Sequence, residues 1–90
     1  MKAVRIACKG RVQGVFFRAS TQAFANKLDV VGWVRNEPNG DVLIHAQGDD
    51  IALNALAEWC RQGPDMARVD EVDVQEADEL PLTSFEVRRS

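Results

Sequence analysis

The sequence has no apolar run that approaches the ~20 residues needed to span a bilayer. Its first ten residues alternate apolar and polar side chains, unlike a secretory signal peptide. Repeats and low-complexity tracts are also absent. A cytoplasmic, globular protein that does not act at a membrane is therefore expected.

Cysteine and histidine are scarce, with two cysteines and one histidine in the chain. They are too scattered to match the spacing of a metal site, so neither a metal nor a cofactor is expected. Cys8 and Cys60 are interpreted as reduced thiols that pack as small hydrophobic side chains. Whether they ever pair is not determined by the sequence.

The charge is small in total but unevenly distributed. The 90 residues carry a net charge of −3, which separates into +6 for residues 1–36 and −9 for residues 37–90. An acidic protein should repel nucleic acid as a whole, whereas its basic first third can attract a small anion. The length predicts one domain over residues 1–90, and no long apolar surface stripe requires a partner, so a monomer is expected.

Hydrophobic periodicity predicts seven elements. Asn39-Gly40 marks a hairpin turn, Asp49 is placed to cap a helix, and Val72 and Val74 differ in register from Val69, which suggests a bulge or bend. The elements are strands at 3–9, 30–36, 42–48, 67–77 and 84–89, and helices at about 20–28 and 51–62. This β-α-β-β-α-β order with a short C-terminal strand predicts a two-layer α+β sandwich. Both helices are expected on one face of the sheet, and the other face is expected to be partly exposed to solvent.

The stretch "GRVQGVFFR", residues 10–18, joins the first strand to the first helix. Glycines there allow successive backbone N–H groups to converge at a helix N-terminus, where an anion such as phosphate binds. Arg18 would add a planar, two-pronged donor suited to phosphoryl oxygens. The spacing matches neither a nucleotide P-loop nor a dinucleotide fingerprint, and on glycine spacing alone an ordinary structural loop fits as well as a phosphate cradle.

"GRVQGVFFR" is followed by "GWVRN", which ends eighteen residues after Arg18, and together they resemble the two signature segments of the acylphosphatase family. The resemblance covers essentially the whole chain. It implies a ferredoxin-like sandwich, with a mainly antiparallel sheet, that hydrolyses acyl phosphates without a metal. It also implies that Arg18 binds phosphate and that Asn36 positions the attacking water. Phe16 occupies a position at which the family varies, so the substrate preference is left open.

The resulting hypothesis is an enzyme that takes a small-molecule acyl phosphate and releases inorganic phosphate, which should also inhibit it. Asn36 can orient a water but cannot act as a base, and Glu37 should point elsewhere, so a substrate oxygen is expected to take the proton. The predicted phosphate-binding loop comprises Arg11, Val12, Gln13, Gly14, Val15, Phe16 and Phe17.

Other conspicuous side chains have simpler interpretations. His45 has no nucleophile or carboxylate at a diagnostic spacing and is predicted to lie on the surface. Trp59 is predicted to be buried or half-buried in the core. Trp33 is predicted to lie on the open face of the sheet, where it could be packed, exposed to solvent, or in contact with the acyl group of a substrate. The acidic run at 70–79 is interpreted as a solvated strand face.

Two alternatives belong to other classes of protein. An RNA-recognition module has the same element order, but it requires aromatic and basic residues that "VLIHAQG", residues 42–48, does not supply. A small-molecule regulatory module would explain an anion cradle without explaining the pairing of Arg18 with Asn36. The physiological acyl phosphate and the biological role are not determined by the sequence.

Overall fold

The computed structural model describes residues 1–89 and confirms the predicted α+β class and element order. The elements are β1 (Lys2–Arg11), α1 (Phe17–Lys27), β2 (Val31–Asn36), β3 (Val42–Gly48), α2 (Asp50–Gln62), β4 (Arg68–Glu76) and β5 (Phe85–Arg88). Neither helix is long and apolar enough to cross a bilayer.

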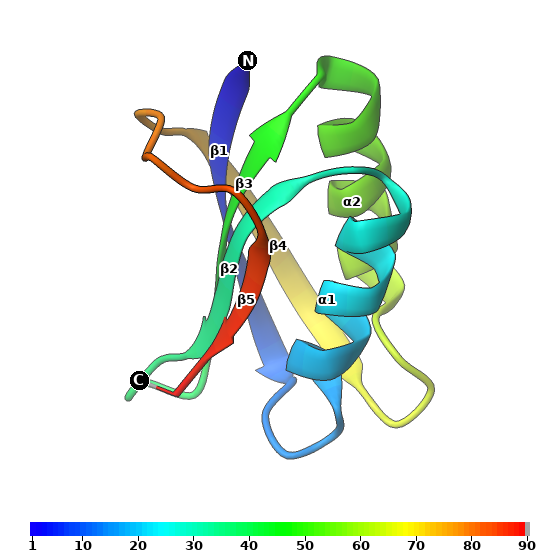
Figure 1. The fold of residues 1–90 in the computed structure, drawn as a ribbon. Helices are drawn as coiled ribbons and strands as arrows, with labels where there is room; N and C mark the ends of the chain where they lie inside the picture. Colours follow the sequence, from blue (N-terminus) through cyan, green and yellow to red (C-terminus); the bar gives the residue numbers. More distant parts are fainter. Residues whose placement is uncertain (90) are drawn as a thin grey trace.

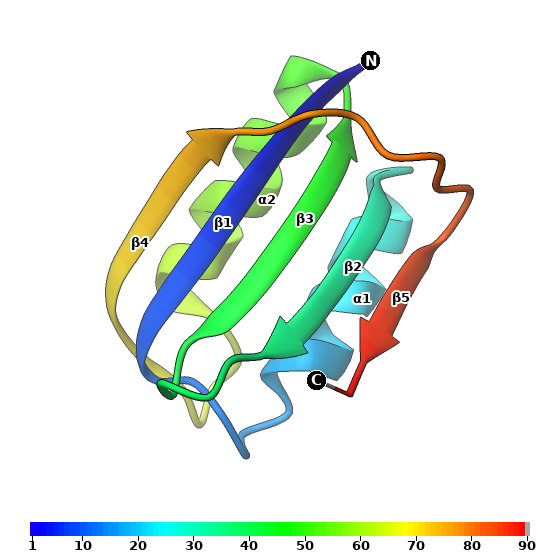
Figure 2. The ribbon, with the colours of Figure 1, turned by 90° about the vertical axis from the view of Figure 1, so that its left-hand side faces the viewer.

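The five strands form one mixed sheet in the order β4-β1-β3-β2-β5, which Figure 2 shows from its open side. The pairs of β1 with β3 and β4, and of β2 with β3, are antiparallel, whereas β5 runs parallel to β2. The expected bulge is confirmed, because Lys9 pairs with Glu71 while Gly10 pairs with Val69, so Asp70 is the extra residue on β4.

Both helices cover the same face of the sheet (Figure 1), as the sequence predicts. The alternation in β1 buries Val4, Ile6 and Cys8 on that face, and α2 contributes Leu53, Leu56 and Cys60 at helical spacing. Trp59 is half-buried, as predicted, and its ring lies 5.6 Å from that of Phe17 and 5.5 Å from that of Phe24. This core joins β1 to both helices and so holds the segment between β1 and α1 at both ends.

Cys8 and Cys60 are both buried free thiols, in agreement with the sequence interpretation. A hydrogen bond with Cys8, together with burial, raises the pKa of the Cys60 thiol well above its usual range. The thiolate is the nucleophilic form of cysteine. These thiols therefore pack the core and offer no reactive group to solvent.

His45 is the clearest error of the sequence analysis, because its side chain is fully buried and does not lie on the surface. It does lie on the open sheet face, where Arg5 Nε donates to its Nδ1 over 2.7 Å, so the ring proton is on Nε2. Nε2 in turn lies 2.7 Å from Gln47 Oε1. Gln47 exchanges two hydrogen bonds with the backbone of Leu80, so the segment between β4 and β5 covers this part of the face.

Trp33 also lies on the open face, as its parity predicts, but only 3% of it is exposed. Three guanidinium groups cover its ring, those of Arg5, Arg35 and Arg88, at 4.9, 4.7 and 5.1 Å from the ring centroid. The tryptophan is therefore packed beneath arginines and is not available as a platform for an acyl group. The contact with the Arg88 guanidinium adds a side-chain link between β2 and β5.

Gly32 in β2 permits the close approach of β3. A Cβ at this position would lie 1.8 Å from the backbone oxygen of His45, and its φ of +153° is one that L side chains rarely adopt. The glycine of "GWVRN" therefore allows β2 and β3 to pair in the register observed. That register places Asn36, the last residue of β2, opposite Val42 at the end of β3.

Candidate active site

The segment between β1 and α1 contains two residues in the left-handed region. Gly14 has φ 73° and Phe16 has φ 62°. A Cβ on Gly14 would meet nothing within 4 Å, so the backbone conformation, and not space, explains the glycine. Left-handed residues that alternate with ordinary ones make successive N–H groups converge on one point, which is the geometry of an anion-binding nest.

α1 begins at Phe17 without a conventional cap. Its N-cap is Phe16, no side chain accepts from the first turn, and no acidic residue lies in that turn. Within residues 1–89 no hydrogen bond has a backbone N–H of residues 12–19 as its donor. These donors and the positive end of the helix dipole are therefore available to an external anion.

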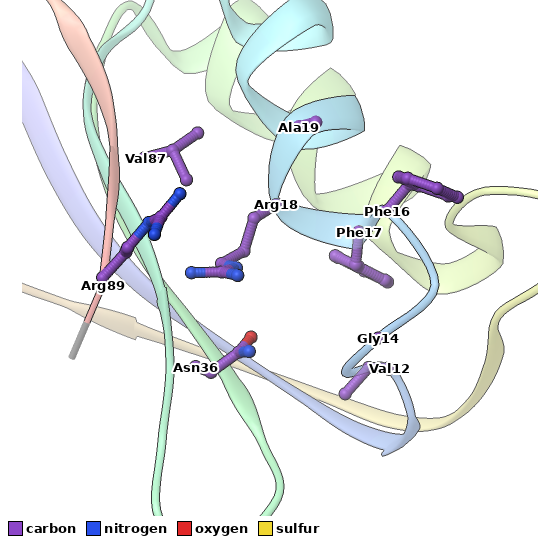
Figure 3. A pocket seen from close by; sticks show the side chains of 9 residues that line it. All are labelled: Val12, Gly14, Phe16, Phe17, Arg18, Ala19, Asn36, Val87 and Arg89. Carbon is purple, nitrogen blue, oxygen red and sulfur yellow. The ribbon is translucent and has the colours of Figure 1, made fainter.

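Arg18 lies in the first turn of α1, and its guanidinium points into the space between Asn36 and Arg89 (Figure 3). Its Nη1 donates to the backbone oxygen of Arg88 over 3.1 Å. This contact joins the helix N-terminus to the end of β5, a strand seventy residues further along the chain. No carboxylate of residues 1–89 forms an ion pair with Arg18, so its charge is free to attract a ligand.

Asn36 reaches the same space from the end of β2 (Figure 3). Its Oδ1 is buried and accepts no hydrogen bond from residues 1–89. Buried polar atoms almost always have a partner, so an unpartnered acceptor in a pocket calls for an explanation. A water or a ligand donor in the pocket would supply the missing hydrogen bond.

These groups share one pocket of about 310 Å³. Among the described residues that line it, the only ionisable side chains are two arginines, so the pocket suits an anion. The lining residues are Val12, Gly14, Phe16, Phe17, Arg18, Ala19, Asn36, Val87 and Arg89.

The structure brings together Arg18, Asn36 and part of the predicted loop, namely Val12, Gly14, Phe16 and Phe17. The other three predicted loop residues do not line the pocket. Arg11 ends β1, where it pairs with Arg68, and Val15 is packed in the core. Gln13 Nε2 donates to the backbone oxygens of Glu37 and Asp41, so it ties the loop to the β2–β3 turn.

Three lining residues, Ala19, Val87 and Arg89, were not anticipated from the sequence. Ala19 follows Arg18 directly, and an earlier helix start would have included it. Val87 belongs to β5 and Arg89 directly follows it, and no local signal specifies the neighbour of this strand in the sheet. They reach the pocket because β5 pairs with β2, the strand that carries Asn36.

Among the residues that the structure describes, no acidic side chain or histidine lines the pocket. Glu37 points elsewhere, as predicted, since its Oε2 lies 2.9 Å from Arg35 Nε. Residues 1–89 contain no group of three histidine, cysteine or acidic side chains that could hold a metal ion. The pocket can therefore bind an anion and orient a water, but its own side chains offer no general base.

Comparison with known proteins shows to which family the chain is similar. The acylphosphatase family model matches residues 4–87. The acylphosphatase of Nocardioides sp. is 48% identical over 86 residues, covering 96% of this chain and 87% of that protein. The acylphosphatase of Marinobacter nauticus is 54% identical over 74 residues, covering 82% and 77% respectively.

Solved structures agree with the sequence comparison. The crystal structure of acylphosphatase from Bacillus subtilis superposes with a TM-score of 0.93 at 36% identity, covering 98% of this chain and 99% of that one. The match thus spans both signature segments, α1 between them, and β5. The chain belongs to the acylphosphatase family.

Proposed function

We propose that the pocket around Arg18 carries out the reaction for which the family is named, hydrolysis of the carboxyl–phosphate bond of small acyl phosphates. The observation that carries this proposal is the meeting of three features in one pocket: unpaired N–H groups at a helix N-terminus, Arg18, and the unpartnered Oδ1 of Asn36. Phosphoryl transfer requires mostly positioning and charge stabilisation, and these features supply both.

Arg18 and the loop bind the phosphoryl group in substrate, transition state and product. A hydrogen bond to a charged group contributes roughly 1.5–3 kcal/mol, and a guanidinium offers two such bonds in the plane of two phosphoryl oxygens. The hydrogen bond from Arg18 Nη1 to the Arg88 backbone oxygen fixes the orientation of the guanidinium and leaves its other N–H groups for the ligand.

Asn36 positions the attacking water. Its Oδ1 accepts from the water, and this contact satisfies the acceptor that the fold buries without a partner. The water oxygen bonds to phosphorus, the bond from phosphorus to the acyl oxygen breaks, and the carboxylate leaves with the electron pair. Because none of the described side chains that line the pocket is a base, a phosphoryl oxygen of the substrate takes the proton, and the products are a carboxylate and inorganic phosphate.

Several further features belong to the same proposal. The chain acts as one domain and as a monomer, needs no metal, and is inhibited by its product phosphate. We propose the cytoplasm as its location, since its two cysteines are free thiols.

The test is turnover of benzoyl phosphate by the purified chain, followed as loss of the substrate with and without a chelator. We expect hydrolysis above the spontaneous rate, and we expect it to survive chelation. An absence of turnover at micromolar enzyme would contradict the function. Activity that is lost on chelation and restored by magnesium or zinc would contradict the metal-free mechanism.

A further inference from the structure

Gln13 lies in the loop between β1 and α1, but its side chain does not line the pocket. Its Nε2 donates to the backbone oxygen of Glu37 over 2.8 Å and to that of Asp41 over 3.0 Å. A primary amide nitrogen carries two N–H groups, so these two bonds use both donors of the side chain. The proposed function assigns no task to this side chain, and its two contacts indicate one.

The two acceptors belong to the turn that directly follows Asn36. The Glu37 N–H donates to the Asp41 backbone oxygen over 2.8 Å, and the Gly40 N–H donates to the Glu37 backbone oxygen over 3.0 Å. The turn is therefore closed by its own hydrogen bonds, and each of the two carbonyl oxygens has a second lone pair for Gln13. Because Glu37 is bonded covalently to Asn36, a side chain that holds this turn also fixes the end of β2 from which Asn36 reaches the pocket.

Gln13 provides the hydrogen-bonded link between the loop and this turn. Within residues 1–89, no other hydrogen bond joins residues 12–16 to residues 36–41. The loop also contains Gly14 and Phe16 in the left-handed region, and its backbone N–H groups donate to no acceptor among residues 1–89. The amide of Gln13 is therefore the polar contact that fixes the loop against the turn, although Gln13 and Glu37 are twenty-four residues apart in sequence.

The distance between these two parts of the site matters for the proposed reaction. The loop and Arg18 hold the phosphoryl group, whereas Asn36 holds the attacking water. The water oxygen must approach phosphorus closely and in line with the bond that breaks, and a displacement of about 1 Å can lower the rate roughly 10²-fold. A link between the loop and the turn after Asn36 keeps the phosphoryl group and the water at the distance that the reaction needs.

We propose that Gln13 is a positioning residue, which sets the separation between the phosphoryl group in the loop and the water on Asn36. This proposal rests on the proposed function. Since the side chain of Gln13 does not line the pocket, it acts through Asn36 and accelerates the reaction only while Asn36 holds the water. Phosphate binding does not depend on it, because the donors to phosphate are Arg18 and the backbone N–H groups.

The test is a double-mutant cycle on the turnover of benzoyl phosphate, with Gln13→Met, Asn36→Ala and the two combined. Methionine has an unbranched side chain of similar length and no N–H donor. Gln13→Asn is taken through the same cycle, since it keeps the amide but is one methylene shorter and cannot hold both carbonyls at their present distances. Thermal unfolding of each variant checks that it is folded at the assay temperature, and the milder Gln13→Asn decides if Gln13→Met is unfolded.

Gln22→Met is the matched control. Gln22 Nε2 also donates to a distant backbone oxygen, that of Phe85 over 3.0 Å, and the side chain is partly buried, as that of Gln13 is. Its contact joins α1 to β5 and holds no part of the turn after Asn36. The control therefore removes an equivalent amide contact without releasing Asn36.

We expect Gln13→Met to lower kcat about 10- to 100-fold when Asn36 is present. When Asn36 is already alanine, the same substitution should lower kcat by less than about twofold, because the water that Gln13 helps to position is then no longer held. Gln13→Asn should cause a smaller loss with the same dependence on Asn36. The inhibition constant of inorganic phosphate should change little, and Gln22→Met should keep the turnover of the unmodified chain.

Three outcomes would overturn the proposal. They are an equal loss of kcat with and without Asn36, full activity of the folded Gln13 variants, and a loss of phosphate affinity as large as the loss of turnover. In each of them the unmodified chain still hydrolyses benzoyl phosphate, so the proposed function stands while the role of Gln13 does not. If the unmodified chain hydrolysed no benzoyl phosphate, the proposed function would fail and this proposal with it.

Discussion

His45 shows how a single side chain can escape a pattern that is otherwise correct. The alternation of side chains along β3 places His45 on the open face of the sheet, as expected, and a face of this kind is commonly exposed to solvent. Here Arg5, Trp33 and Gln47 surround the ring, and the contact of Gln47 with Leu80 closes that part of the face. Arg5 is forty residues away and Leu80 thirty-five residues away in sequence, so local periodicity could not reveal that the histidine is buried.

The buried His45 makes the stability of the fold depend on pH. Burial lowers its pKa below the ordinary value of 6.5, and the charges of Arg5 and Arg88 act in the same direction, against the hydrogen bond with Gln47. Below pH 6.5 the unfolded chain therefore binds a proton that the folded chain does not, so the unfolding free energy falls with falling pH, by at most about 1.4 kcal/mol per unit. The decline ends at the lowered folded pKa. Urea titrations from about pH 7.5 to 5 should show it.

The matched variant for this experiment is His45→Gln, which keeps an acceptor for Arg5 but does not titrate. Its unfolding free energy should vary less over the same pH interval. An unchanged pH dependence in His45→Gln would mean that other groups cause the decline, and would contradict the role assigned to His45.

Arg18 and Asn36 could be found from the sequence because each closes a recognisable short motif, and the structure brings them to one pocket. Arg89 could not be found in this way. It belongs to no motif, and its position depends on the pairing of β5 with β2 over a separation of more than fifty residues.

At the scale of elements, helix caps decide which boundaries the sequence can predict. α2 has a polar cap, since Asp49 Oδ1 accepts from the Ala52 N–H over 2.8 Å, and Asp49 is the cap that the sequence predicts. α1 begins at Phe17, three residues before the predicted Ser20, because the left-handed Phe16 caps it without any side-chain acceptor. Because no side-chain acceptor is present, the first N–H groups of α1 remain free for an anion. The helix boundary that the sequence mispredicts therefore lies at the candidate site.

The cap of α2 gives a prediction for this element. Asp49→Ala removes the acceptor for the Ala52 N–H and should lower the unfolding free energy by about 1 kcal/mol. Asp65→Ala is the matched control, since it removes an exposed carboxylate for which no hydrogen bond or ion pair is found among residues 1–89. The midpoint of urea unfolding, measured for both, should shift only for Asp49→Ala. Equal shifts would show that lost charge, and not the cap, is responsible.

For the whole molecule, the pocket joins parts that fold together but are distant in sequence. The loop after β1, the end of β2 and the segment after β5 all contribute to it, and β2 lies between β3 and β5 in the sheet. The element order and the two-layer class follow from periodicity and turn signals along the chain. The position of β5 does not, because its choice of edge depends on Trp33, Arg88 and other contacts made only in the assembled sheet.

A ligand that binds only the folded molecule stabilises it. Inorganic phosphate should therefore raise the unfolding temperature, and it should inhibit hydrolysis competitively, because it shares the phosphoryl oxygens of the substrate. The shift in unfolding temperature is measured in thermal melts with increasing phosphate. The control is chloride at the same ionic strength, with no sulfate present. An unfolding temperature that does not change at high phosphate would contradict a phosphate cradle in this pocket.

The central claim is a division of work between Arg18 and Asn36, and one pair of variants tests it most directly. Turnover of benzoyl phosphate and binding of inorganic phosphate by calorimetry are measured on the same preparations of Arg18→Ala and Asn36→Ala. Circular dichroism should be native for both. Arg18→Ala should lose turnover and phosphate binding together, because the arginine contacts the phosphoryl group throughout the reaction. Asn36→Ala should lose roughly 10²–10³-fold in turnover, the scale of one deleted preorganised polar group, while its phosphate affinity changes little. If Asn36→Ala lost phosphate affinity as severely as Arg18→Ala, or kept full activity, the water-positioning role of Asn36 would be contradicted.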